Sequence, residues 1–267
     1  MKFALVNGQR KEPQPNLPGD CPGCGNPMVA RCGDVRVWHW AHRGRRHCDS
    51  WWENETEWHR DWKGQFPVDW QEIVHHAEYG ERHIADVKTG DDWVIEFQHS
   101  YIKPEERRSR EGFYPKLVWV VDGLRRKRDE AGLRRAWEES ATPFGTNAPV
   151  RLIWSQEGAL LRDWVGSRAH VFFDLGDEQV LWWLLPYAND VNSYVTRISR
   201  TAFIETHRRT TTKGANDFDS FAEELIGLVA DNESPRRAQL SVRGQRDFVR
   251  MSKKPLQGHF RRRRYRL

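Results

Sequence analysis

The chain has 267 residues, 38% hydrophobic and 30% charged, with a mean hydropathy of −0.84. This polar composition, without an apolar run of about 18 residues or a hydrophobic signal segment, argues against a membrane span and predicts a cytoplasmic protein. Lys and Arg number 43 against 38 Asp and Glu, and they gather in four short runs at 43–46, 125–128, 208–209 and 261–264. Such clustering is typical of contact with nucleic acid, although an ordinary solvated surface explains any single run equally well.

A zinc site is expected near the N-terminus, in a segment with all four cysteines and three histidines: Cys21, Cys24, Cys32, Cys48, His39, His42 and His47. In a chain without secretion signals, this crowding favours a metal site over disulfides. Cys21 and Cys24 flank a Pro-Gly turn and can bind one Zn²⁺, and a second pair must complete the tetrahedron. We favour His42 and Cys48 for that pair. His39 is the first substitute, and Cys32 and His47 stay open.

Residues 82–98 predict a β-hairpin, because two strand-like runs flank a turn rich in Gly and Asp. Side chains alternate across a strand, so Glu96 and Gln98 point to one face and the intervening apolar residues to the other. Asp86 on the first strand can converge with Glu96 on the second. Two carboxylates beside a main-chain carbonyl are typical ligands of Mg²⁺ or Mn²⁺, which suggests phosphodiester chemistry.

The segments around this hairpin predict a sheet covered by helices. Residues 51–63 read as a helix on which Glu55, His59 and Lys63 share one face, although Glu55 and Lys63 could also form an ordinary surface ion pair. A strand at 72–79, the hairpin, a helix opened by Pro104 and a buried strand at 116–121 follow. The predicted order over residues 53–122 is therefore α, β, β, β, α, β, a mixed α/β arrangement.

The remaining chain is expected to form an α+β region. The patterns predict a charged helix at 125–139, a small antiparallel sheet at 150–187 and a helix at 219–230, while 192–207 fits either a helix or a strand. We predict three parts: residues 1–50 with the zinc site, residues 51–140 as the core, and residues 141–267 with a basic tail.

Five separated motifs resemble the competence protein CoiA-like family over roughly residues 20–125. They are His39-Trp40-Ala41-His42, Glu55-Thr56-x-x-His59-x-x-x-Lys63, Arg82-x-x-Ala85-Asp86, Glu96-Phe97-Gln98-x-Ser100, and Arg110 with Tyr114. The resemblance implies a core similar to the PD-(D/E)XK nuclease fold, with an N-terminal zinc knuckle and a C-terminal α+β extension.

The same resemblance implies roles for the site residues. Asp86 and Glu96 would hold the metal, Glu55 would complete the site, and Gln98 stands where many relatives have a lysine. A glutamine can orient a water but cannot act as a base. The general base is therefore open, with Lys63 and His59 as candidates, and His59 could instead contact a phosphate or make a structural hydrogen bond.

The expected function is a Mg²⁺-dependent deoxyribonuclease, with an endonuclease preferred, that acts on DNA in uptake, recombination or defence. The alternative is a catalytically weak nucleic-acid-binding adaptor that works with a partner protein. A third expectation is an RNA-directed nuclease.

Overall fold

The computed structural model describes residues 1–44, 49–51, 53–76, 80–145, 149–188, 192–209 and 218–233. The chain divides into two units, Met1–Ile226 and Gly227–Leu267. The described part of the second unit, residues 227–233, is helical. No helix among the described residues is long and apolar enough to cross a membrane.

A five-stranded antiparallel sheet opens the first unit. Its order is β2-β1-β3-β4-β5, and its strands are β1 (Ala4–Val6), β2 (Gln9–Lys11), β3 (Pro18–Asp20), β4 (Pro27–Arg31) and β5 (His39–His42). Asn7 and Gly8, at φ 54° and 77°, form the two-residue turn between β1 and β2 that hairpins favour. Trp40 is fully buried at the centre of this sheet's core, and its indole N–H donates to Lys11 O over 2.9 Å.

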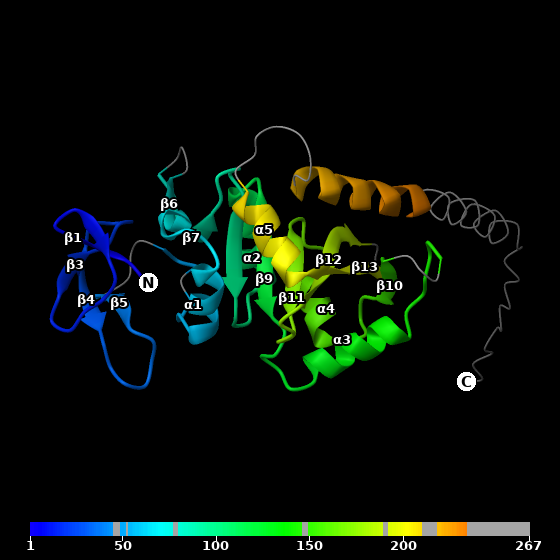
Figure 1. Cartoon of the computed structure of the whole chain (residues 1–267), viewed down its shortest axis with the longest axis horizontal. Coiled ribbons are helices and arrows are strands. Elements are labelled where there is room, and N and C mark those ends of the chain that lie inside the picture. Colours follow the sequence, from blue (N-terminus) through cyan, green and yellow to red (C-terminus); the bar gives the residue numbers. More distant parts are fainter. Residues whose placement is uncertain are drawn as a thin grey trace, which may run out of the picture. The chain divides into compact units, whose positions relative to one another are not determined.

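An eight-stranded mixed sheet forms the rest of the first unit (Figure 1). Its order is β10-β13-β12-β11-β9-β8-β7-β6, with β6 (Gln71–His76), β7 (Arg82–Lys88), β8 (Val94–Gln98), β9 (Leu117–Asp122), β10 (Arg151–Trp154), β11 (His170–Asp174), β12 (Val180–Ala188) and β13 (Asn192–Ser199). The helices are α1 (Glu57–Gly64), the 3-10 helix η1 (Val68–Trp70), α2 (Pro104–Phe113), α3 (Asp129–Glu138), α4 (Ala159–Trp164) and α5 (Arg200–Arg208), and residues 218–226 are also helical. Strand β9 pairs in parallel with both β8 and β11.

Aromatic side chains pack the helices onto both faces of this sheet. On one face, Trp62 of α1 stacks on Phe97 with ring centroids 5.7 Å apart and meets Phe203 of α5 edge-on. On the other face, Trp164 of α4 packs on Trp119 at 5.2 Å. The buried rings explain why a polar chain can hold a stable sheet, since each large aromatic removes about 150–250 Å² from water.

Asp174 at the end of β11 ties α1 to the C-terminal strands. Its Oδ2 accepts hydrogen bonds from the indoles of Trp58 at 3.1 Å and Trp62 at 2.9 Å. Its Oδ1 accepts from Arg200 at 3.0 Å. A buried carboxylate is stable only with such partners, so these bonds hold α1 and the start of α5 against one strand end.

The predicted order α, β, β, β, α, β is found from α1 to β9. The start of the first helix differs from the prediction: α1 begins at Glu57, because Thr56 is its N-cap and Glu55 precedes it. The strands expected as a small antiparallel sheet at 150–187 instead extend the core sheet, because β11 pairs with β9. Residues 192–207 contain both a strand and a helix, β13 and α5. The boundaries proposed at residues 50 and 140 stay predictions, and the basic tail lies outside the described residues.

Candidate functional site

A candidate metal site lies at the edge of the small sheet. The ligand atoms of Cys21, Cys24 and His42 all lie within 4.8 Å of one another, and Cys24 Sγ is 3.4 Å from His42 Nε2. Gly25, at φ 70°, closes the turn by donating its N–H to Cys21 O over 2.8 Å, which brings both thiols to one side. Two thiols and an imidazole suit a metal such as zinc.

Three of the four ligands chosen from the sequence are thus neighbours, and the fourth, Cys48, lies outside the described residues, as does His47. His39 is not part of this group, and its Nδ1 contacts Val37 O at 2.9 Å. Cys32 is not part of it either. Across the described ranges, no other set of three His, Cys, Asp or Glu residues has its ligand atoms within the same spacing.

A second candidate site is an acidic cavity of about 80 Å³ beside β7 and β8. A buried water needs about 10–15 Å³ of such volume, so the cavity has room for several waters or a hydrated ion. Its ionisable lining consists of Asp49, Glu53, Glu55, Glu72, Asp86, Glu96, His42, His59, Lys63, Arg110 and the Met1 amino group. Carboxylates outnumber the fixed cations, so the cavity favours a cation.

Asp86 and Glu96 meet where β7 and β8 separate. The two strands pair through Val87 and Ile95. Beyond this pair, the backbone N–H groups bond to the carboxylate side chains of the opposite strand instead of to its backbone. Phe97 N–H donates to Asp86 Oδ2 over 3.0 Å, and Asp86 N–H donates to Glu96 Oε1 over 3.4 Å. The structure therefore brings together the two carboxylates that the hairpin pattern selected.

The surroundings of Glu96 disfavour its charged form. Burial and the adjacent Asp86 charge raise its pKa to about 8, although Arg110 opposes the shift with Nη1 3.1 Å from Glu96 Oε2. Arg110 comes from α2, where it also pairs with Glu106 and donates to Trp51 O. A positive ion beside Asp86 and Glu96 would favour the charged form of both.

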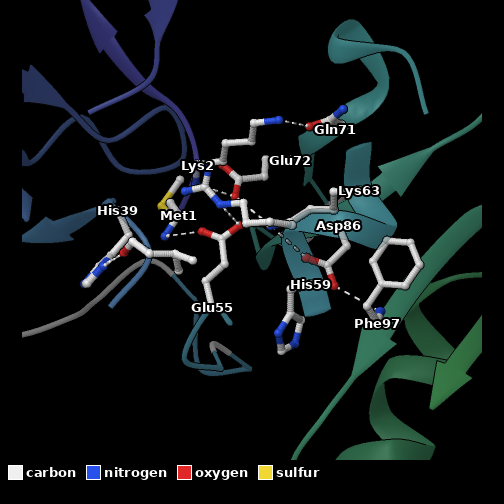
Figure 2. Close-up of polar contacts among 12 residues, drawn as sticks. Met1, Lys2, His39, Glu55, His59, Lys63, Gln71, Glu72, Asp86 and Phe97 are labelled. Atoms are coloured by element: carbon white, nitrogen blue, oxygen red, sulfur yellow. Dashed lines mark hydrogen bonds and ion pairs between the residues drawn. The ribbon is translucent and has the colours of Figure 1, made fainter. Parts of the chain in front are cut away.

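Lys63 of α1 lies between three carboxylates (Figure 2). Its Nζ is 2.6 Å from Glu55, 3.0 Å from Glu72 and 3.5 Å from Asp86. Burial opposes its charge, but the three carboxylates outweigh burial and raise the lysine pKa. The raised pKa keeps Lys63 charged in this arrangement, and the Glu55–Lys63 contact is a buried ion pair instead of a solvated one.

Glu72 is a site residue that the sequence patterns did not reveal. It is the second residue of β6 and has a left-handed conformation, φ 48°, which is rare for a residue with a Cβ and marks local strain. Lys2 N–H and Phe3 N–H donate to its carboxylate over 2.6 and 2.9 Å. Burial opposes ionisation, but Lys63 and these donors lower the Glu72 pKa to about 2. No local signal separates Glu72 from any other acid at the start of a strand.

The side-chain amide of Gln98 hydrogen-bonds to Glu53 and to Ser100. Its Nε2 donates to Glu53 Oε2 over 2.7 Å and to Ser100 O over 3.2 Å. Both partners are obligate acceptors, which fixes the amide nitrogen on this side. Gln98 thus orients Glu53, a second residue that the sequence reasoning missed. Glu53 also accepts from Ser100 N–H, and its Oε2 lies 3.9 Å from His59 Nε2.

The chain therefore combines a Cys/His metal site on a small N-terminal sheet with a buried carboxylate cavity in a mixed α/β sheet. Residues 20–50 match the family model described as the N-terminal domain of competence protein CoiA. This match supports the predicted CoiA-like resemblance over the segment that contains Cys21, Cys24 and His42. No curated protein and no solved structure gives a significant match.

Proposed function

We propose that this CoiA-like protein is a metal-dependent DNA nuclease with a PD-(D/E)XK-like core. The observation that carries the proposal is Lys63 Nζ, 3.5 Å from Asp86 Oδ1 at the point where β7 and β8 separate. Gln98 cannot supply a positive charge beside the two carboxylates. Lys63, from α1, supplies that charge instead. The order α, β, β, β, α, β over residues 57–122 supports the same proposal.

Asp86 and Glu96 fit a divalent ion such as Mg²⁺ or Mn²⁺. Both side chains offer oxygen ligands, and a positive ion would reduce the repulsion between their charges. The cavity beside them can hold a hydrated ion. When bound, the ion would polarise the phosphate and activate water. Glu55 would also hold Lys63 in place, because Lys63 at 2.6 Å and Arg60 at 2.8 Å both contact its Oε1.

The chain's own cations would act on charge that develops at the phosphate. Lys63 is held in place by three carboxylates, so it needs no reorganisation during the reaction, which is the condition under which electrostatic stabilisation is strongest. Arg110 neutralises Glu96 and keeps the acidic cavity compatible with an anionic substrate. The Cys21–Cys24–His42 site would fix the small sheet.

The test is cleavage of labelled linear, circular and single-stranded DNA, beside RNA, in Mg²⁺, Mn²⁺ or EDTA. We expect metal-dependent products from the wild type and none from Asp86→Asn or Glu96→Gln. Glu105→Gln is the matched control, since Glu105 lies on α2 with a side chain that is 76% exposed. Cleavage that survives in Asp86→Asn would contradict the proposal, and products from RNA alone would redirect it to an RNA-directed nuclease.

The alternative is a nucleic-acid-binding adaptor that acts with a recombination or defence partner. The observation in its favour is that Arg110 and Lys63 already neutralise the carboxylates and that Gln98 replaces a lysine. In that case no condition yields products, while Glu96→Gln binds DNA as tightly as the wild type. Binding should then weaken steeply with added salt.

A further inference from the structure

The N-cap of α1 fixes the tautomer of His59. Thr56 N–H donates to His59 Nδ1 over 3.2 Å, and Thr56 Oγ1 lies 2.8 Å from the same nitrogen. A backbone amide can only donate, so Nδ1 must be an acceptor. The proton of the neutral ring is therefore on Nε2. This arrangement is a capping box with histidine at the position usually held by Glu or Gln.

The Nε2–H group faces the acidic cavity. His59 is 4% exposed, and its Nε2 has no hydrogen-bond partner among the described residues. A buried donor without a partner is costly, by about 1–3 kcal/mol, so native structures usually supply an acceptor. The nearest acidic atom is Glu53 Oε2 at 3.9 Å, which is beyond a direct hydrogen bond.

Glu53 is held rigidly on the other side of this gap. Gln98 Nε2 and Ser100 N–H donate to its two oxygens, one to each. Burial opposes its charge, but His59 and Ser100 lower the Glu53 pKa, so the group is a carboxylate at neutral pH. The cavity thus presents a fixed donor and a fixed acceptor that are too far apart to bond directly.

Water is the species that fits this pair. It can accept from His59 Nε2–H and donate to Glu53, and polar groups separated by more than 3.5 Å are commonly bridged in this way. A phosphate oxygen would satisfy His59 but would bring its negative charge against Glu53. The donor and acceptor therefore select a water over an anionic oxygen.

We propose that Glu53 and His59 hold the attacking water of the hydrolysis, an inference that rests on the proposed nuclease function. The water oxygen bonds to phosphorus while the bond from phosphorus to the leaving sugar oxygen breaks. One water proton passes to Glu53, and the leaving oxygen takes a proton from solvent. Glu53 is then the general base that the sequence left open, and His59 and Gln98 are positioning residues.

The kinetic test compares Glu53→Gln, His59→Gln and Gln98→Met with Glu57→Gln, an exposed acid in the first turn of α1. General-base catalysis is worth roughly 10²–10⁴-fold, so we expect kcat to fall by about that factor in Glu53→Gln. The KM for DNA should stay within about threefold, because a bridged water makes no substrate contact. A raised KM with unchanged kcat would overturn the proposal.

A second readout does not depend on cleavage. In the full chain labelled with ¹⁵N-histidine, with His59→Gln used for assignment, the His59 ring should show a proton on Nε2 and none on Nδ1. Glu53→Gln should shift the Hε2 resonance through the shared water. A proton on Nδ1, or no shift in Glu53→Gln, refutes the proposal. Absence of wild-type cleavage with both NMR results as expected would instead refute the nuclease function.

Discussion

The buried ion cluster around Lys63 makes a quantitative prediction about stability. The Glu72 pKa falls from an ordinary 4.5 to about 2 in the folded chain. This depression corresponds to about 3 kcal/mol of folding free energy at neutral pH. Removing one partner of a buried ion pair costs about 3–5 kcal/mol, because the other charge is left uncompensated. Lys63→Met and Glu72→Gln should each lower the free energy of unfolding by about 3–5 kcal/mol.

A double-mutant cycle separates the pair from its surroundings. We expect Lys63→Met with Glu72→Gln to cost about 1–3 kcal/mol less than the two single changes together, because the charges are lost as a pair. Urea unfolding at pH 7, followed by tryptophan fluorescence, gives the four free energies. Additive effects within about 0.5 kcal/mol would refute the reasoning.

An exposed pair provides the matched control for this cycle. Lys88 Nζ and Asp92 Oδ1 are 3.0 Å apart, but their side chains are 35% and 76% exposed. Solvent screens such a pair, so Lys88→Met and Asp92→Asn should show a coupling below about 1 kcal/mol. In the wild type, the contribution of Glu72 to the free energy of unfolding should also vanish as pH falls from 4.5 towards 2, because its folded-state pKa is depressed.

Three further predictions concern other parts of the chain. Burial lowers the pKa of both His170 and His207 to about 4, so the unfolding free energy should fall as pH drops from 6.5 to 4, and His207→Phe should remove up to about 3 kcal/mol of that loss. An unchanged pH slope in urea titrations would contradict this assignment. Cys24→Ser should lower bound zinc from about one ion per chain towards none by elemental analysis, while full retention would argue against the site. A Cβ on Gly19 would lie 3.0 Å from the Trp40 ring, so Gly19→Val should cost about 1–3 kcal/mol in urea unfolding, and no loss would show that the core can adjust.

The sequence predicts the elements around the hairpin well, because their signals are local. Alternation in 94–98 correctly separates Glu96 and Gln98 from Phe97, which packs on Trp62. The predicted start of α1 is too early because Glu55, four residues before His59, continues the helical spacing. The true N-cap, Thr56, uses histidine instead of Glu or Gln to complete its capping box, and this substitution hides the usual signature.

Long-range pairing explains the remaining differences. The parallel contact between β9 and β11 joins residues about fifty positions apart, and alternation within each strand carries no information about it. Glu72 enters the site through its left-handed backbone and through amides of residues 2 and 3. Glu53 is held in the site by its hydrogen bond from Gln98. Such partners depend on the folded chain, so composition and spacing cannot select them.

The hydrogen bonds at Asp174 limit how the cavity could be moved to another scaffold. They join the helix that presents His59 and Lys63 to a strand contributed by the second half of the chain. A fragment that ended near residue 140 would keep the acidic residues but would leave two indole donors and one sheet edge without partners. Protein engineers who want this cavity as a portable unit would need to carry β11 to α5 with it.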